Sequence, residues 1–209
     1  MSITTKRDWR TSKAHLLLLS KFLRDTPFKT DDYWSAVLDE SIENAINRFI
    51  KSGLLIKSDD ETHLSFKYTV PELKKILENK KLPISGKKND LISRLIAADP
   101  NSIKNLISGL VLLHCSSEGA KIVEEFLLSE KIARDNVELQ VQELLQKRMF
   151  RDASMAVASF EAKQVFSRGW NVDWAHFNPD HHVTVLTYIF SNKPRMLSQL
   201  NDNEIKTVR

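Results

Sequence analysis

Two adjacent lysines stand between a loop and an amphipathic helix in the stretch LPISGKKNDLISRL, residues 82–95. Free N–H groups at the start of a helix bind anions, and Gly86 leaves room for a phosphate to approach the backbone. Lys87 and Lys88 would add two positive charges beside those donors. This combination of residue types predicts a site that binds a phosphate backbone.

The predicted nucleic-acid interface contains nine residues that share either a positive charge or a position in this loop. They are Lys74, Lys75, Lys80, Lys81, Ser85, Gly86, Lys87, Lys88 and Arg94. This set does not favour the reading of bases, because no aromatic residue is interleaved for stacking and Asn89 is the only amide nearby. We therefore expect contacts with phosphates. A solvated lysine-rich surface is the alternative interpretation.

The excess positive charge of the chain is concentrated around these residues. Residues 67–99 hold eight Lys or Arg and four Asp or Glu, a net charge of +4, which equals the net charge of the whole 209-residue chain. Residues 1–66 and residues 100–209 each carry equal numbers of both signs. A localised positive patch attracts polyanions such as nucleic acids.

The other chemistry-bearing residues do not form a recognisable catalytic or metal site. His176, Asp180, His181 and His182 are the only cluster of metal-ligand types, and their spacing matches no usual zinc pattern. The sequence signatures of nucleotide-binding loops, hydrolases and metalloproteases do not occur. We predict no catalytic residue, no metal and no cofactor, and a protein that is not an enzyme.

Two short helices are expected to position the candidate interface. Thr69 and Glu72 have the spacing of a capping box, which predicts the start of the first helix. The second helix is expected from about Lys88 to Ala98. The residues predicted to be buried between the helices are Leu73, Ile76, Leu77, Leu91, Ile92 and Leu95, and those expected to plug the gap are Leu82, Pro83 and Ile84.

The whole segment TVPELKKILENKKLPISGKKNDLISRLIAAD, residues 69–99, resembles the SAP motif, a helix–extended loop–helix module. The resemblance rests on the apolar spacing of both helices, on Leu82-Pro83, and on the turn Ser85-Gly86-Lys87-Lys88. One departure is Lys81, which stands where the family often has Gly. The resemblance implies DNA binding, often with little sequence preference, and sometimes RNA or protein binding instead.

The residues before this segment predict a winged-helix-like unit. Helical periodicity covers residues 13–24 and 41–51, and the alternation of Leu64, Phe66 and Tyr68 predicts a β-hairpin over 54–68. The outward face of the 41–51 helix offers Asn44, Asn47, Arg48 and Lys51 to a partner. The expected hairpin tip, Asp59-Asp60-Glu61, would be repelled by phosphates, so protein contacts or plain packing are alternative roles.

The residues after this segment predict helices alone. Apolar periodicity indicates helices within 102–115, 118–133, 137–149 and 150–169. Trp170 and Trp174 follow in an aromatic loop that is more typical of core packing than of base stacking. No apolar stretch is long enough to cross a membrane. The single Cys115 excludes an internal disulfide and indicates a reducing compartment.

These observations predict a mainly α protein in three parts. Residues 1–66 form the winged-helix-like domain, residues 67–100 the SAP-like motif, and residues 101–209 an α-helical domain. The predicted function is that of an accessory protein that binds double-stranded DNA, with RNA as a possible ligand. The alternatives are a protein–protein adaptor acting through residues 101–209, or the non-catalytic front part of a DNA-processing enzyme. The expected location is the bacterial cytoplasm, on the nucleoid, or the eukaryotic nucleus.

Overall fold

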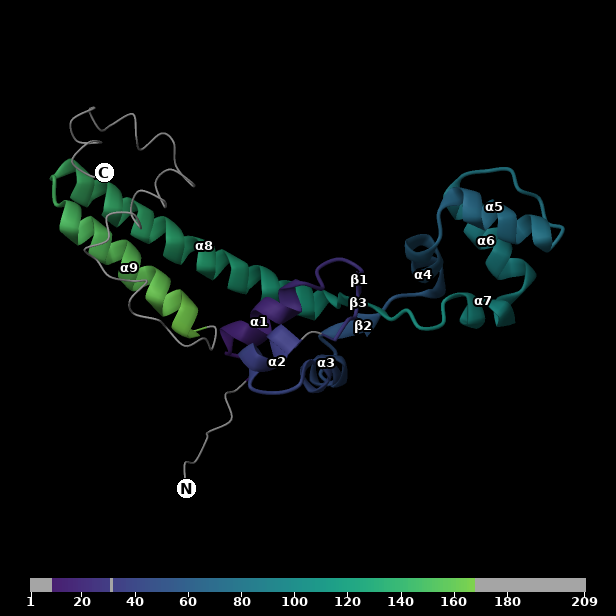
Figure 1. Ribbon diagram of the computed structural model, residues 1–209, viewed down its shortest axis with the longest axis horizontal. Helices are drawn as coiled ribbons and strands as arrows, with labels where there is room; N and C mark the ends of the chain where they lie inside the picture. The colour runs from purple at the N-terminus through teal and green to yellow at the C-terminus, as the bar shows by residue number, and fades with distance from the viewer. Residues whose placement is uncertain (1–8, 31, 168–209) are drawn as a thin grey trace, which may run out of the picture. The chain divides into compact units, whose positions relative to one another are not determined.

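The computed structural model describes residues 9–30 and 32–167, and in this part of the chain the protein is mainly α-helical, as predicted (Figure 1). The helices are α1 (Lys13–Ser20), α2 (Asp32–Leu38), α3 (Ile42–Lys51), α4 (Asp60–Lys67), α5 (Val70–Asn79), α6 (Lys88–Ala98), α7 (Pro100–Leu106), α8 (Ser117–Gln146) and α9 (Phe150–Ser167). The strands are β1 (Thr26–Pro27), β2 (Leu55–Lys57) and β3 (Leu112–Cys115).

The chain divides into two compact units. One contains Leu17–Ser35 and Glu40–Val123, and therefore the sheet together with α3 to α7. Of the described residues, the other contains 9–16, a short piece at Ala36–Asp39, and 124–167. The whole segment that resembles the SAP motif lies within the first unit.

A three-stranded antiparallel sheet in the first unit has the order β1-β3-β2. The central strand β3 pairs Leu113 with Thr26 of β1 and Cys115 with Leu55 of β2. Just beyond β2, the N–H of Ser58 donates to the carbonyl of Leu112 over 3.1 Å. The chain between these two residues is thus an insertion between neighbouring strands, and it carries α4, α5, α6 and α7 (Figure 1).

The hairpin predicted over residues 54–68 is wrong, because its second half is helix α4. The Asp59 carboxylate accepts a hydrogen bond from the N–H of Thr62 over 2.7 Å, which caps the start of this helix. Hydrogen bonds from Thr62 also hold the pKa of Asp59 below its usual value. Acidic residues at this helix start are favoured by the helix dipole, so the aspartates begin a helix instead of forming a hairpin tip.

The prediction that residues 100–209 contain helices and no strands is also wrong, because Leu112–Cys115 is a strand. Helix α7 ends at Leu106, and the apolar residues Leu112–Cys115 form strand β3. A short apolar run of this kind is compatible with either a buried helix or a buried strand, and here the pairing with β1 and β2 decides. The helices expected in 118–133 and 137–149 are a single continuous helix, α8.

The inserted helices share one apolar core. α5 and α4 pack on α6, and α7 packs on α6 and α4 (Figure 1). The core residues are Leu64, Leu73, Leu77, Leu91, Ile92, Leu95 and Ile103. Five of these were predicted from the helix pair alone, whereas Leu64 and Ile103 come from the flanking helices. The helix pair α5 and α6 is therefore part of a four-helix unit.

Helix α9 and the part of α8 from Glu124 onward form a helical hairpin in the second unit (Figure 1). Val141 of α8 packs on Ala153 and Val157 of α9, and these three side chains are buried. Lys13 makes an ion pair with Glu130 of α8 over 2.6 Å. None of the described helices combines the length and the apolar character that crossing a membrane requires.

The core of the four-helix unit can be tested with Leu91→Ala. Leu91 is fully buried, so removal of its side chain should lower the free energy of unfolding by about 3 kcal/mol. The matched control is Leu128→Ala, because Leu128 of α8 is 58% exposed and should change stability by less than about 0.5 kcal/mol. Chemical denaturation followed by circular dichroism measures both. Equal effects of the two variants would contradict this packing.

Candidate nucleic-acid interface

The first helix of the pair begins with the predicted pairing of Thr69 and Glu72. The Glu72 carboxylate accepts hydrogen bonds from the N–H and from the hydroxyl of Thr69, both over 2.7 Å. These bonds hold the pKa of Glu72 below its usual value. Pro71 lies in the first turn, where its missing N–H removes no helical bond. The start of α5 is therefore fixed by the hydrogen bonds between Thr69 and Glu72.

The end of α5 places Lys81 in an unusual backbone conformation. Its φ is +55°, in the left-handed region, where Gly is normally preferred. The N–H of Leu82 donates to the carbonyl of Leu77, and the N–H of Lys81 donates to that of Glu78, both over 2.9 Å. This is the Schellman arrangement that closes helix ends. The turn typical of the SAP motif is thus present even though Lys replaces Gly.

Arg94 holds the loop between the two helices. Its Nη1 donates to the carbonyl of Pro83 over 2.6 Å and to the carbonyl of Ser85 over 2.9 Å. The guanidinium therefore fixes the backbone on both sides of Ile84. Arg94 was predicted to extend the positive surface, and the structure shows that it also organises the loop.

The start of α6 is occupied by a carboxylate. Asp90 accepts the backbone N–H of Lys87 over 2.8 Å. Gly86 has φ +117°, and a Cβ at this position would lie 2.9 Å from Oδ2 of Asp90. The space beside Gly86, which was expected to admit a phosphate, is already taken by Asp90. Phosphate binding at this helix start would depend on the lysine side chains more than on the N–H of Lys87.

Two of the candidate lysines are bound to other parts of the protein. Nζ of Lys80 donates to Asp99 over 2.6 Å and to the hydroxyl of Ser102 over 3.2 Å. The hydrogen bond from Lys80, followed by those from Ser102, holds the pKa of Asp99 below its usual value. Nζ of Lys88 donates to the carbonyl of Ser65 in α4 over 2.5 Å. Lys88 was expected to face solvent, but it is half-buried and links α6 to α4.

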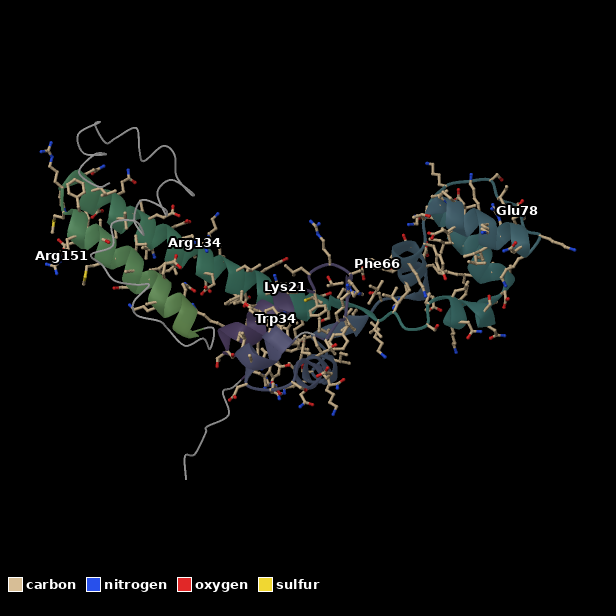
Figure 2. The ribbon with its side chains drawn as sticks, in the orientation of Figure 1. Lys21, Trp34, Phe66, Glu78, Arg134 and Arg151 are labelled. Atoms are coloured by element: carbon tan, nitrogen blue, oxygen red, sulfur yellow. The ribbon has the colours of Figure 1, made fainter. Side chains whose placement is uncertain are left out.

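The remaining candidate lysines are exposed, and their ammonium groups make no hydrogen bond or ion pair with other described residues. They are Lys74, Lys75, Lys81 and Lys87. Ser85 and Gly86 are exposed as well. Exposed carboxylates reduce the positive charge of this surface, and Figure 2 labels one of them, Glu78 on α5. The structure therefore separates four cations that are available to a ligand from three that serve the fold.

Two exposed apolar residues of this unit were not predicted from the sequence. Ile84 was expected to plug the gap between the helices, but it is 44% exposed. Phe66, labelled on α4 in Figure 2, is 54% exposed, although its alternation with Leu64 suggested a half-buried strand. The sequence signal that was overlooked is the acidic N-cap at Asp59, which makes this segment a helix.

Elsewhere in the described part of the chain, Asp25, Ser58 and His114 meet in an arrangement that differs from a hydrolytic triad. The hydroxyl of Ser58 donates to Asp25 over 2.5 Å, and Nδ1 of His114 lies 3.1 Å from the same carboxylate oxygen and 3.2 Å from the hydroxyl. In a hydrolytic triad the serine and the carboxylate face opposite ring nitrogens, whereas here both face Nδ1. Burial raises the pKa of the Cys115 thiol to about 11, which keeps it protonated near neutrality.

No group of three or more metal-ligating side chains is found within residues 9–30 and 32–167. The histidine and aspartate cluster from His176 to His182 lies outside the described residues, as do Trp170 and Trp174.

A comparison with protein-family models matches residues 66–100 to the SAP domain. The predicted resemblance is confirmed, and the matched region coincides with the helix pair and its loop. A SAP domain indicates binding to DNA in general. The comparisons with curated proteins and with solved structures give no match.

The left-handed conformation of Lys81 can be tested with Lys81→Gly. A left-handed backbone costs a non-glycine residue about 1–2 kcal/mol, and replacement by Gly removes this cost. Part of the resulting stabilisation is offset because Gly has a larger conformational entropy in the unfolded chain. We expect Lys81→Gly to raise the free energy of unfolding by about 0.5–1 kcal/mol. The control is Lys75→Gly within α5, which should lower it by about 1 kcal/mol. Denaturant titration distinguishes the two signs, and destabilisation by both variants would contradict the strain at Lys81.

Proposed function

We propose that this protein is a non-enzymatic accessory protein that holds double-stranded DNA by its phosphate backbone, with little sequence preference. The match of residues 66–100 to the SAP domain supports DNA binding. The observation that carries the backbone mode is the set of four exposed lysines on the SAP helices and loop, whose ammonium groups make no hydrogen bond or ion pair with other described residues. Such side chains are free to neutralise phosphates and release the counterions bound to DNA.

The distribution of charge supports the same proposal. All the net positive charge of the chain resides in residues 67–99. Lys80 and Lys88 are bound within the protein, so we assign the phosphate contacts to Lys74, Lys75, Lys81 and Lys87. Phosphates carry no sequence information, so contacts of this kind position a protein on DNA without selecting a site. This role fits a protein that acts on the bacterial nucleoid or in a nucleus.

The arrangement of the sheet and the first helices supports a second contact with DNA, through helix α3. The order α1-β1-α2-α3-β2, with β3 in the centre of the sheet, supports the proposal of a winged helix in which the inserted helices stand in place of the wing. Helix α3 would then be the recognition helix. Its exposed side is lined by Asn44, Asn47 and Lys51, whereas Arg48 is engaged by Glu40. Asp59, Asp60 and Glu61 form the start of α4 and not a wing tip. The repulsion expected between a wing tip and phosphates therefore does not apply.

Of the two alternative functions, only the adaptor predicts a different result in a DNA-binding experiment. A protein–protein adaptor would use the helices after residue 100, where Leu128, Ile132 and Leu139 of α8 are exposed. The front part of a DNA-processing enzyme would bind DNA in the same way as an accessory protein. Binding of the protein to duplex DNA, single-stranded DNA and RNA, measured by fluorescence anisotropy, separates the nucleic-acid roles from the adaptor role.

The backbone mode can be tested with Lys87→Gln. Loss of one phosphate contact should weaken binding to two unrelated duplexes alike, and should reduce the slope of log affinity against log salt by about 0.9. Lys131→Gln on α8 is the control, because it removes an exposed lysine outside the SAP domain and should leave affinity and slope unchanged. A loss confined to one duplex would mean that Lys87 reads bases. An unchanged slope would remove Lys87 from the interface.

Lys88→Gln should have a different effect from Lys87→Gln. Its ammonium holds the Ser65 carbonyl, so its replacement should lower the free energy of unfolding by about 1–2 kcal/mol. Lys87→Gln should leave stability within about 0.5 kcal/mol of the original protein. Thermal or urea denaturation of both variants provides the comparison. Equal stability of the two variants would contradict the link between α6 and α4.

A further inference from the structure

Ile84 is exposed at the centre of the SAP loop, and its position is not explained by packing. The core of the four-helix unit includes Leu82, two residues earlier, as a half-buried neighbour. Ile84 does not join this core and remains 44% exposed. A single exposed aliphatic side chain is ordinary on a protein surface. The surroundings of Ile84 make this one different.

The backbone around Ile84 is held at three points. Arg94 donates to the carbonyls of the residues on either side of Ile84, over 2.6 and 2.9 Å. The left-handed turn at Lys81 fixes the start of the loop, and Asp90 fixes its end through the N–H of Lys87. The loop therefore presents Ile84 in a defined position. Little conformational entropy would be lost when a ligand covers it.

Cationic side chains flank Ile84 along the loop. Lys81 precedes it and Lys87 follows it in the sequence. Both side chains are exposed, and neither ammonium group makes a hydrogen bond or ion pair with other described residues. On a duplex, phosphates line the two edges of a groove, and the bases lie between them. If both lysines hold phosphates, as the proposed function assigns, an apolar side chain on the loop between them would face the bases. Branched aliphatic residues in such positions insert between neighbouring base pairs and partly unstack them.

We propose that Ile84 is an apolar wedge that contacts the bases of a DNA duplex and unstacks one base step, while Lys81 and Lys87 hold phosphates. This inference rests on the proposed binding of duplex DNA. It adds an apolar contact to an otherwise electrostatic interface. Arg94 is a positioning residue in this arrangement, because it acts on the loop and not on the DNA.

The first measurement is the affinity of Ile84→Ala for duplex DNA across a range of salt concentrations. We expect about a tenfold loss of affinity, which corresponds to the burial of most of an isoleucine side chain. The salt slope should stay unchanged, because no phosphate contact is lost. Ile132→Ala on α8 removes the same side chain from an exposed site outside the SAP domain and should change neither quantity. Circular dichroism should show all variants folded, since both side chains are exposed.

The second measurement is the fluorescence of 2-aminopurine placed at successive positions in the duplex. Unstacking by the original protein should raise the fluorescence at one step, and Ile84→Ala should abolish the increase. Affinity and fluorescence of Ile84→Ala equal to those of the original protein would overturn the wedge, even if Lys87→Gln weakens binding as expected. A loss with Phe66→Ala and not with Ile84→Ala would also overturn it. Failure of the original protein to bind any duplex would instead overturn the proposed function.

Discussion

The candidate interface depends on one constraint, which is the burial of apolar side chains between α4, α5, α6 and α7. Leu73 and Leu77 from the first SAP helix meet Leu91 and Leu95 from the second, and all four are fully buried. The flanking helices contribute Leu64 and Ile103 to the same core. An isolated pair of helices of this length would bury little surface and would be marginal in water. The flanking helices supply the additional buried area that allows the loop to have one conformation.

Hydrogen bonds and ion pairs within the protein then decide which cationic side chains remain available to a ligand. Three of the cations predicted for the interface are used within the fold: Lys80 by Asp99, Lys88 by the Ser65 carbonyl, and Arg94 by two loop carbonyls. Charge counting cannot distinguish these from the exposed lysines, although their roles differ. The distinction matters because substitution of a structural cation would weaken binding indirectly, by disturbing the loop.

Much of the SAP segment could be predicted from its sequence, because its signals are local. The spacing of Thr69 and Glu72 and the apolar periodicity around Leu73 and Leu91 each depend on residues within a few turns. The position of Ile84 could not be predicted, because it depends on the contact that Arg94 makes with the loop from the next helix. Strand β3 could not be predicted either, because its conformation is decided by pairing with residues far away in the sequence.

The strand signal at residues 64–68 failed for a related reason. In a strand, Leu64 and Phe66 would lie on the same face. In helix α4 they lie on nearly opposite sides, so Leu64 is buried in the core and Phe66 is exposed. The helix cap at Asp59 was the stronger local signal.

The buried ring of His63 links helix α4 to the sheet. Its Nδ1 donates to the Asp59 carbonyl over 2.7 Å, and its Nε2 accepts the N–H of Leu112 in β3 over 3.1 Å.

The place of the SAP domain between β2 and β3 has a consequence for how the sheet folds. The entropy cost of closing a connection rises slowly with its length, by about 0.6 kcal/mol for each doubling. Within the insertion, the hydroxyl of Tyr68 donates to the carbonyl of Leu106 over 2.9 Å, so its first and last helices lie together. Once these helices have formed, only short segments separate β2 from β3. Early folding of the inserted helices would therefore shorten the effective loop and speed the completion of the sheet.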